Sequence, residues 1–348
     1  MLRDALIGQT AIWQRLMTDL EAGRVPHALM LCGPAGSGKL ALALAFAEAL
    51  LCQHPKDDGE ACGECVSCRM AAKLEHPDLH LTFPFVKGQR IKNADDAITD
   101  HYISEWRARL LQSPYFDLND WLEDIDAGNS QATYYVAEAD NIQRKLALKS
   151  NQGGRKVMIV WLPEKMNQET ANKLLKLFEE PPAGTHFLMV SEEPDLVLGT
   201  ILSRTQRIMV PPLSREDYNK AHPQRDERLM LDMFIMLMRL GYQRKVKDLR
   251  EWADQLAGMG RETQKTFLQF CQRQVRENFV YNFHLKELND QTGEEEAFSR
   301  NFARFVNERN VIALTDELAK AEEDIARNVN ARIVFFDLAL KVIVMLIQ

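Results

Sequence analysis

The stretch from Gly33 to Leu40, Gly-Pro-Ala-Gly-Ser-Gly-Lys-Leu, has the spacing of a phosphate-binding loop. Glycines let the N–H groups of such a loop turn inward toward phosphate, and its lysine reaches the β- and γ-phosphates. The next position usually carries Ser or Thr for magnesium, whereas Leu40 offers no ligand atom. We therefore expect ATP or ADP binding to be weak or absent, and a glycine-rich turn that binds nothing is the plainer alternative. The predicted nucleotide-binding residues are Gly33, Pro34, Gly36, Ser37, Gly38 and Lys39.

Four of the six cysteines form a second group, which could hold a metal: Cys52, Cys62, Cys65 and Cys68. Two consecutive Cys-x-x-Cys steps bring thiolates together in tight turns, as a tetrahedral zinc site requires. Four cysteine ligands leave no open position for water, so we predict a structural Zn²⁺. The remaining two, Cys32 and Cys271, lie in apolar surroundings and are predicted core residues.

The elements that must position these residues alternate between strands and helices. An apolar run at Ala28–Cys32 precedes the loop, and an Ala/Leu-rich helix is predicted to follow it over 40–51. Further buried strands are predicted at 157–162, 186–190 and 207–210. This alternation predicts an α/β domain with a parallel sheet covered on both faces.

The predicted α/β domain spans residues 1–213 and includes a zinc module, 52–68, and an insertion of about 84–130. The insertion has mixed charge, several aromatic residues and little periodicity, and we expect helices around 98–111 and 118–126. We interpret it as a structurally neutral insertion that is exposed to solvent. Contact of its basic residues with nucleic acid is the alternative.

The character of the chain changes after the paired prolines at 211 and 212. Residues 214–228 are polar, with Pro223 inside the segment, and are predicted to be a linker. Residues 229–348 show helical spacing with almost no strand signal, so we predict a separate all-α domain there.

Composition limits the function classes. A net charge of −7 argues against a protein that binds nucleic acid by itself, because neutralising the phosphates of nucleic acid needs a basic surface. The N-terminal residues lack an apolar signal region, and the apolar run at 333–347 is interrupted by Asp337 and Lys341. We expect a cytoplasmic protein without membrane contact, in which reduced cysteines bind metal.

Several motifs in order resemble the delta-prime subunits of bacterial DNA polymerase III clamp loaders, within the AAA+ superfamily. They are Ile7-Gly8-Gln9, His27-Ala28, the phosphate loop, the four cysteines, Ala171-Asn172-x-Leu174-Leu175-Lys176-x-x-Glu179-Glu180-Pro181-Pro182, and Ser203-Arg204-Thr205. Together they cover about residues 5–82 and 130–213. The helical C-terminal part resembles the family's collar domain only in kind.

The resemblance implies a subunit of a five-membered ring, with delta and gamma/tau subunits, that loads the sliding clamp on primer-template DNA. It makes the chain part of a DNA-directed DNA polymerase holoenzyme.

In the family a Ser-Arg-Cys motif supplies an arginine finger to the neighbouring subunit's nucleotide. By position Arg204 would be that finger, with Thr205 in place of cysteine. A guanidinium suits this role because its planar donors neutralise charge on a transferred phosphoryl group. The alternative is that Arg204 only forms a local ion pair within the chain.

A working ATPase of this kind carries acidic residues at the end of its second strand, which here is the strand predicted at 157–162. This chain lacks them. Leu162 and Pro163 occupy those places, and Glu164 is one step further on. Without a magnesium-orienting Asp or a water-activating Glu, we predict no intrinsic ATPase. The resemblance also implies a small helical lid domain over the nucleotide, where this chain has only the short segment 214–228. Either most of the lid is lost, leaving a shortened lid or linker, or the sequence is a shortened form. In both cases we expect a bound nucleotide to be less enclosed. The alternatives are a self-contained P-loop ATPase acting on DNA or protein, and a zinc-bearing DNA-binding module.

Overall fold

The computed structural model describes residues 2–88, 90–91, 93–127, 130–151, 154–222, 227–284, 291 and 293–346. The chain divides into two compact units, Met1–Pro223 and Gln224–Gln348, and each is described by itself. Residues 223–226 of the predicted lid or linker lie outside the described residues.

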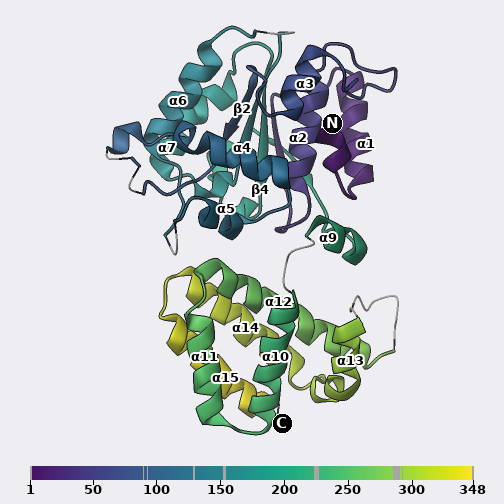
Figure 1. Ribbon diagram of the computed structural model, residues 1–348, viewed down its shortest axis with the longest axis vertical. Helices are drawn as coiled ribbons and strands as arrows, with labels where there is room; N and C mark the ends of the chain where they lie inside the picture. Colours follow the sequence, from purple (N-terminus) through teal and green to yellow (C-terminus); the bar gives the residue numbers. More distant parts are fainter. Residues whose placement is uncertain are drawn as a thin grey trace. The chain divides into compact units, whose positions relative to one another are not determined.

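A parallel sheet forms the centre of the first unit (Figure 1), with five strands among the described residues in the order β2-β3-β4-β1-β5. The strand before the phosphate loop, β1, lies between β4 and β5, and every pairing in the sheet is parallel. The strands are β1 (Ala28–Cys32), β2 (Leu79–Thr82), β3 (Lys156–Trp161), β4 (Thr185–Ser191) and β5 (Gln206–Met209).

Alternate residues of each strand enter two separate cores. Leu29 and Leu31 of β1 pack in the core formed with α1, α2 and the insertion, while Met30 and Cys32 face α6, α7 and α8. The helices of this unit are α1 (Thr10–Glu21), α2 (Lys39–Leu51), α3 (Val66–Ala72), α4 (Ile103–Gln112), α5 (Leu118–Asp124), α6 (Val136–Ala147), α7 (Gln168–Glu179), α8 (Gly199–Leu202) and α9 (Arg215–Ala221). Short 3-10 turns are η1 (Leu2–Ala5), η2 (Ala94–Asp96), η3 (Thr99–Tyr102), η4 (Pro163–Lys165) and η5 (Pro194–Leu196).

The insertion is not a solvated appendage, so that expectation is wrong. Trp106 and Trp121 are almost fully buried, and the ring of Phe83 stacks on that of Trp106 with centroids 4.1 Å apart. The indole N–H of Trp121 donates to the carbonyl of Pro84 at 2.9 Å. Burial of aromatic side chains of this size removes a large apolar area from water, so the insertion packs as part of the unit's core.

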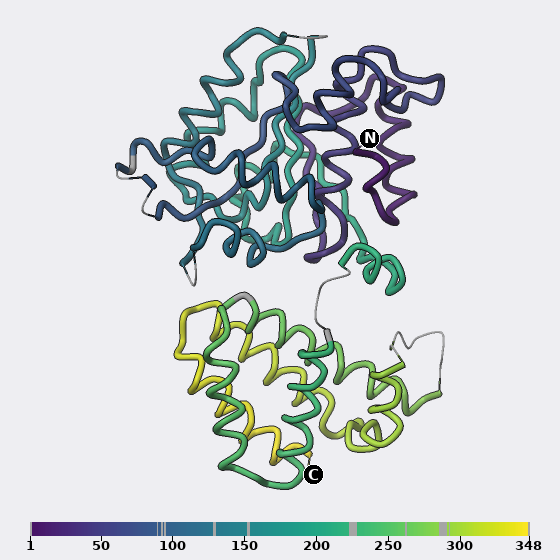
Figure 2. The backbone as a smooth tube through the Cα atoms, viewed as in Figure 1, coloured from purple at the N-terminus to yellow at the C-terminus, as the bar shows by residue number. Residues whose placement is uncertain are grey.

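The second unit is all-helical among its described residues, and Figure 2 traces it from green to yellow. One core joins its helices, with Phe234, Trp252, Phe267 and Phe335 fully or almost fully buried. The elements are α10 (Glu227–Tyr242), α11 (Val246–Ala257), α12 (Arg261–Tyr281), α13 (Gly293–Phe302), η7 (Ala303–Phe305), α14 (Val311–Ala326) and α15 (Ala331–Met345).

These features confirm the predicted fold class as far as its architecture goes: an α/β domain with a parallel sheet and a phosphate-binding loop, followed by an all-α region. In the described part of the chain, none of the helices combines the length and the apolar character needed to cross a bilayer.

Candidate functional site

The phosphate loop connects β1 to α2 at the carboxyl edge of the sheet. Gly36 and Gly38 have φ angles of 74° and 81°, which favour glycine because a side chain is strained there. Gly33 is needed for a different reason, since a Cβ on it would lie 2.2 Å from the carbonyl oxygen of Val210. The path of the loop is therefore fixed by the close approach of Val210 to Gly33 and by the left-handed backbone conformation of Gly36 and Gly38.

The amino group of Lys39 is turned onto its own loop. Its Nζ donates to the carbonyl of Pro34 at 2.5 Å and to Oγ of Ser37 at 3.2 Å. Lys39 is 3% exposed and Ser37 is 1% exposed. Burial lowers the pKa of Lys39 below its usual value, while the charges of Glu192 and Glu164 oppose that shift.

Three rings from outside the loop lie directly against it, and we call them the ring cover: Tyr115, Tyr218 and His222. A Cβ on Gly38 would lie 3.1 Å from the ring of Tyr115, and one on Gly36 would lie 2.9 Å from Tyr218 and 3.0 Å from His222. The rings also contact one another, with His222 centred 4.4 Å from Tyr218 and 5.9 Å from Tyr115.

The ring cover comes from two distant parts of the sequence. Tyr115 belongs to the insertion, between α4 and α5, whereas Tyr218 lies on α9 and His222 directly follows it. In Figures 1 and 2, α9 lies beside the N-terminal segment of the same unit, where a Cβ on Gly8 would lie 2.8 Å from Leu213. The segment 214–228, which we expected to leave a bound nucleotide less enclosed, thus contributes α9, and α9 packs against the loop.

The positions where an ATPase carries its metal ligand and base hold apolar residues. Leu40, the second residue of α2, is buried in the core, and Leu162, which directly follows β3 and precedes Pro163, is 1% exposed. Glu164 is held by the loop after β4, because its Oε1 accepts the backbone N–H groups of Glu192 at 2.8 Å and Glu193 at 3.2 Å.

Glu192 is the second acidic residue near the loop, and sequence reasoning missed it. Burial raises the pKa of Glu192 to about 7, against the opposing charge of Lys39 and with a further contribution from Glu164. A carboxyl group that holds its proton near neutral pH is a poor magnesium ligand, because metal binding requires the carboxylate.

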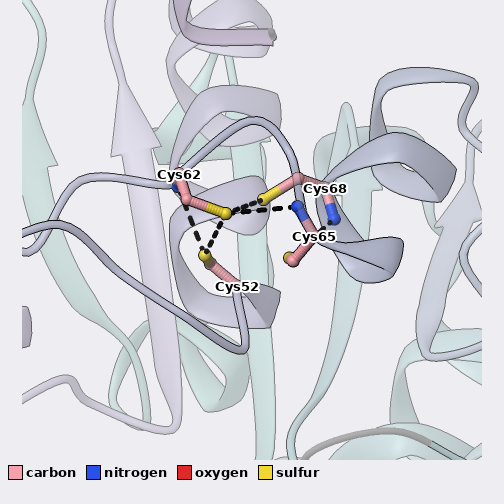
Figure 3. Close-up of side chains that lie close together, drawn as sticks. All are labelled: Cys52, Cys62, Cys65 and Cys68. Atoms are coloured by element: carbon pink, nitrogen blue, oxygen red, sulfur yellow. Dashed lines mark hydrogen bonds between the residues drawn. The ribbon is translucent and has the colours of Figure 1, made fainter.

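The four predicted metal ligands come together where α2 ends and α3 begins (Figure 3). Their sulfur atoms all lie within 4.8 Å of one another, and Sγ of Cys62 is 3.7 Å from that of Cys52 and 3.9 Å from that of Cys68. A tetrahedral Zn–S site with bonds of about 2.3 Å requires sulfurs about 3.8 Å apart. The cluster therefore has the donor set and the spacing of a four-thiolate metal site.

Backbone N–H groups favour the ionised form of Cys62 and Cys65, whereas burial raises the pKa of Cys52 and Cys68. The N–H of Cys62 donates to Sγ of Cys52 at 3.3 Å, that of Cys65 to Cys62 at 3.3 Å, and that of Cys68 to Cys65 at 3.4 Å. Burial opposes ionisation of Cys65, but N–H donors from Cys68 and Gln53 and neighbouring thiols bring its pKa down to about 6. Thiolates are the form that binds metal. All six cysteines are free of disulfides.

Arg204 lies between α8 and β5 and is held by three acceptors. Its Nε donates to Oε1 of Glu179 at 2.6 Å, and its Nη1 donates to the carbonyl of Thr200 at 2.7 Å and to Oγ of Ser203 at 3.0 Å. The side chain is 32% exposed. The guanidinium is thus partly accessible and already oriented.

The sheet separates Arg204 from the chain's own phosphate loop. Arg204 precedes Gln206, which pairs with Leu29 near the start of β1, whereas Gly33 follows the end of β1. Leu29 and Gly33 are four residues apart, and a strand rises about 3.3 Å per residue, so the start of β5 and the loop lie at opposite edges of the sheet, about 13 Å apart along the strands. Arg204 therefore lies too far from its own loop to contact a phosphate bound there.

Comparison with known proteins places the first unit in a family. A family model described as "DNA polymerase III, delta subunit" matches residues 8–214, which is more than half of the chain. The DNA polymerase III subunit delta' of Pseudomonas aeruginosa is 32% identical over 194 residues, covering 55% of this chain and 46% of that protein. Its counterpart in Escherichia coli K12 is 28% identical over 229 residues, covering 66% and 55%.

A relative with another name also matches. The DNA polymerase III subunit tau of Bacillus subtilis is 27% identical over 202 residues, covering 58% of this chain and 28% of that protein. The chain spans about half the length of the delta' relatives that it matches.

Proposed function

This chain belongs to the family described as DNA polymerase III, delta subunit, and on that basis we propose that it is a non-catalytic subunit of a clamp loader. In this proposal it assembles with delta and gamma/tau subunits in a five-membered ring. The ring loads the sliding clamp on primer-template DNA, as part of the polymerase holoenzyme in the cytoplasm. Residues 1–213 act as the P-loop domain, 214–228 as a shortened lid or linker, and 229–348 as a collar for oligomerisation.

Within that ring, Arg204 acts as an arginine finger in trans. The position of Arg204 carries this proposal, since it lies at the sheet edge opposite the chain's own loop and is partly exposed. A permanently charged guanidinium with planar donors can stabilise the charge that builds on a neighbour's transferred phosphoryl group.

The chain itself does not hydrolyse ATP in this proposal. Leu40, Leu162 and Pro163 supply no magnesium ligand and no base, and Glu164 is occupied by backbone N–H groups. Nucleotide binding at Gly33, Pro34, Gly36, Ser37, Gly38 and Lys39 is accordingly weak or absent.

The cysteine cluster binds one structural Zn²⁺. Its four thiols would hold the ion, which would tie the end of α2 to α3 and leave no position for a catalytic water. Preorganised N–H···S bonds support this role, because they favour the thiolates that zinc needs.

The finger is tested with an assembled loader that contains this chain. Arg204→Ala should lower the ATPase rate of the complex and leave its elution in size-exclusion chromatography unchanged. Arg207→Ala is the matched control, because Arg207 is an exposed arginine on β5. An Arg204→Ala loader with the full ATPase rate would refute the finger.

The class of protein is tested by mixing the purified chain with candidate loader subunits and clamp, with and without ATP. A stable mixed ring supports the proposal. ATP turnover by the isolated chain, abolished by Lys39→Ala, would instead favour a self-contained P-loop ATPase.

A further inference from the structure

The phosphate loop keeps the backbone and the lysine that bind phosphate, which we call the cradle, and the ring cover of the same chain packs on it. We propose that the loop is a latent site for the polyphosphate of a nucleotide, which α9 holds shut by placing Tyr218 and His222 against Gly36. Tyr115 forms the fixed wall of this closed site, and α9 is the part that moves.

The cradle keeps what phosphate binding needs. Gly36 and Gly38 retain the left-handed backbone, and α2 begins at Lys39 and runs for 13 residues, so its N-terminal N–H groups and dipole favour an anion at the loop. Lys39 satisfies its amino group with Pro34 and Ser37. Both bonds are internal to the loop, and phosphate oxygens could replace them.

The cover excludes solvent from the groups that would bind phosphate. Tyr218 and His222 lie within contact distance of Gly36, and Nε2 of His222 is 3.4 Å from the carbonyl oxygen of Gly36. Ser37 and Lys39 are almost completely buried. Pro34 and Ala35 at the tip of the loop are exposed, so the rings cover the part of the loop around Gly36 and Gly38, and a ligand that binds there displaces them.

Tyr115 is held too firmly to be the moving part. Its hydroxyl accepts the backbone N–H of Ile7 at 2.7 Å, and its ring is 7% exposed within the core. The insertion that carries it is fixed by buried Trp106 and Trp121. Displacing Tyr115 would open that core.

The α9 segment is held by far less. It is a helix of seven residues, and Ala221 is its only buried member. A helix this short has little stability alone, so its position depends on Leu213, Tyr218, Ala221 and the adjoining His222. Ala221 is the one residue of α9 that belongs to the unit's core, with Leu213 packed against that core just before the helix, so we expect withdrawal of α9 to leave most of the core in place.

The experiment measures equilibrium binding of a fluorescent ATP analogue to the full-length chain. The double variant Tyr218→Ala/His222→Ala should bind the analogue at least tenfold more tightly than the wild type. Inorganic tripolyphosphate should compete and adenosine should not, because the cradle recognises phosphate. Adding Lys39→Ala to the double variant should abolish the gain.

The matched control is Asn219→Ala, an exposed change on the same helix, which should leave binding as in the wild type. His222→Ala alone removes one ring and provides a second measurement if the double variant is poorly folded by circular dichroism. Equal affinity of the wild type and the opened variants would overturn the proposal. Binding that survives Lys39→Ala, or that adenosine rather than tripolyphosphate displaces, would do so as well.

Discussion

Arg204 and Glu179 form an ion pair at the amino edge of the sheet, in which Nε of Arg204 donates to Oε1 of Glu179 at 2.6 Å. The side chains are 32% and 45% exposed, so solvent screens their attraction. We predict that Glu179→Gln changes the free energy of unfolding by less than about 1 kcal/mol. Urea denaturation measures this, with exposed Glu180→Gln as the matched control. A loss above about 2 kcal/mol would contradict the weak pair.

The cysteine cluster should hold close to one zinc ion per chain. Cys65→Ser removes one of four ligands, so metal content measured by plasma emission should fall strongly and the melting temperature should decrease. Chelation of the wild type should lower the melting temperature in the same direction. Cys271→Ser is an unsuitable control because Cys271 is fully buried, whereas the exposed Ser104→Ala leaves the cluster intact. Undiminished zinc in Cys65→Ser would rule out the four-thiolate site.

Glu192 should make the unfolding free energy depend on pH. Burial raises its pKa from the usual 4.5 to about 7 in the folded chain, so near pH 6 the folded state keeps a proton that the unfolded state has lost. Stability should therefore fall as pH rises from about 4.5 to 7, by about 3 kcal/mol at 1.36 kcal/mol per unit. Glu192→Gln lacks this term.

The difference between Glu192→Gln and the wild type isolates that term from all other titrating groups. Relative to the wild type, the variant should gain about 3 kcal/mol between pH 4.5 and pH 8. Urea denaturation at several pH values measures the gain. A difference that stays constant with pH would show that Glu192 titrates alike in both states.

Local patterns in the sequence were sufficient for the elements that carry continuous apolar runs. The strand predicted at 157–162 is β3, Lys156–Trp161, and the phosphate loop joins a strand to a helix as predicted. Short ligand spacing likewise predicted the cysteine cluster, because its four residues lie within one stretch of chain. The four-residue edge strand β2 was missed, since Leu-His-Leu-Thr is too short to show a period.

The ring cover could not be predicted, because its contacts join residues that are far apart in the chain. Gly36 touches His222 across 186 positions, and neither the polar character of 214–228 nor its length indicates where α9 packs. The aromatic content of the insertion did contain a usable signal, because large rings such as Trp106 and Trp121 are seldom left in solvent.

Gly33 gives a test of how tightly β5 constrains the phosphate loop. A Cβ at this position would lie 2.2 Å from the carbonyl oxygen and 3.3 Å from the carbonyl carbon of Val210. Both are backbone atoms of the residue that directly follows β5, so the two chain segments must separate to accept a methyl group. Gly33→Ala should therefore reduce the unfolding free energy by about 3 kcal/mol, at the upper end of overpacking effects.

The matched control is Gly199→Ala at the start of α8. A Cβ there meets no atom within 4 Å, and its φ lies outside the left-handed range. This change should be neutral, or stabilising by about 0.5 kcal/mol, because alanine is the better helix former. Equal stabilities of the two variants in urea denaturation would mean that the loop can move away from β5. A large loss confined to Gly33→Ala would instead show that the loop's first glycine is required by the sheet, independently of any phosphate.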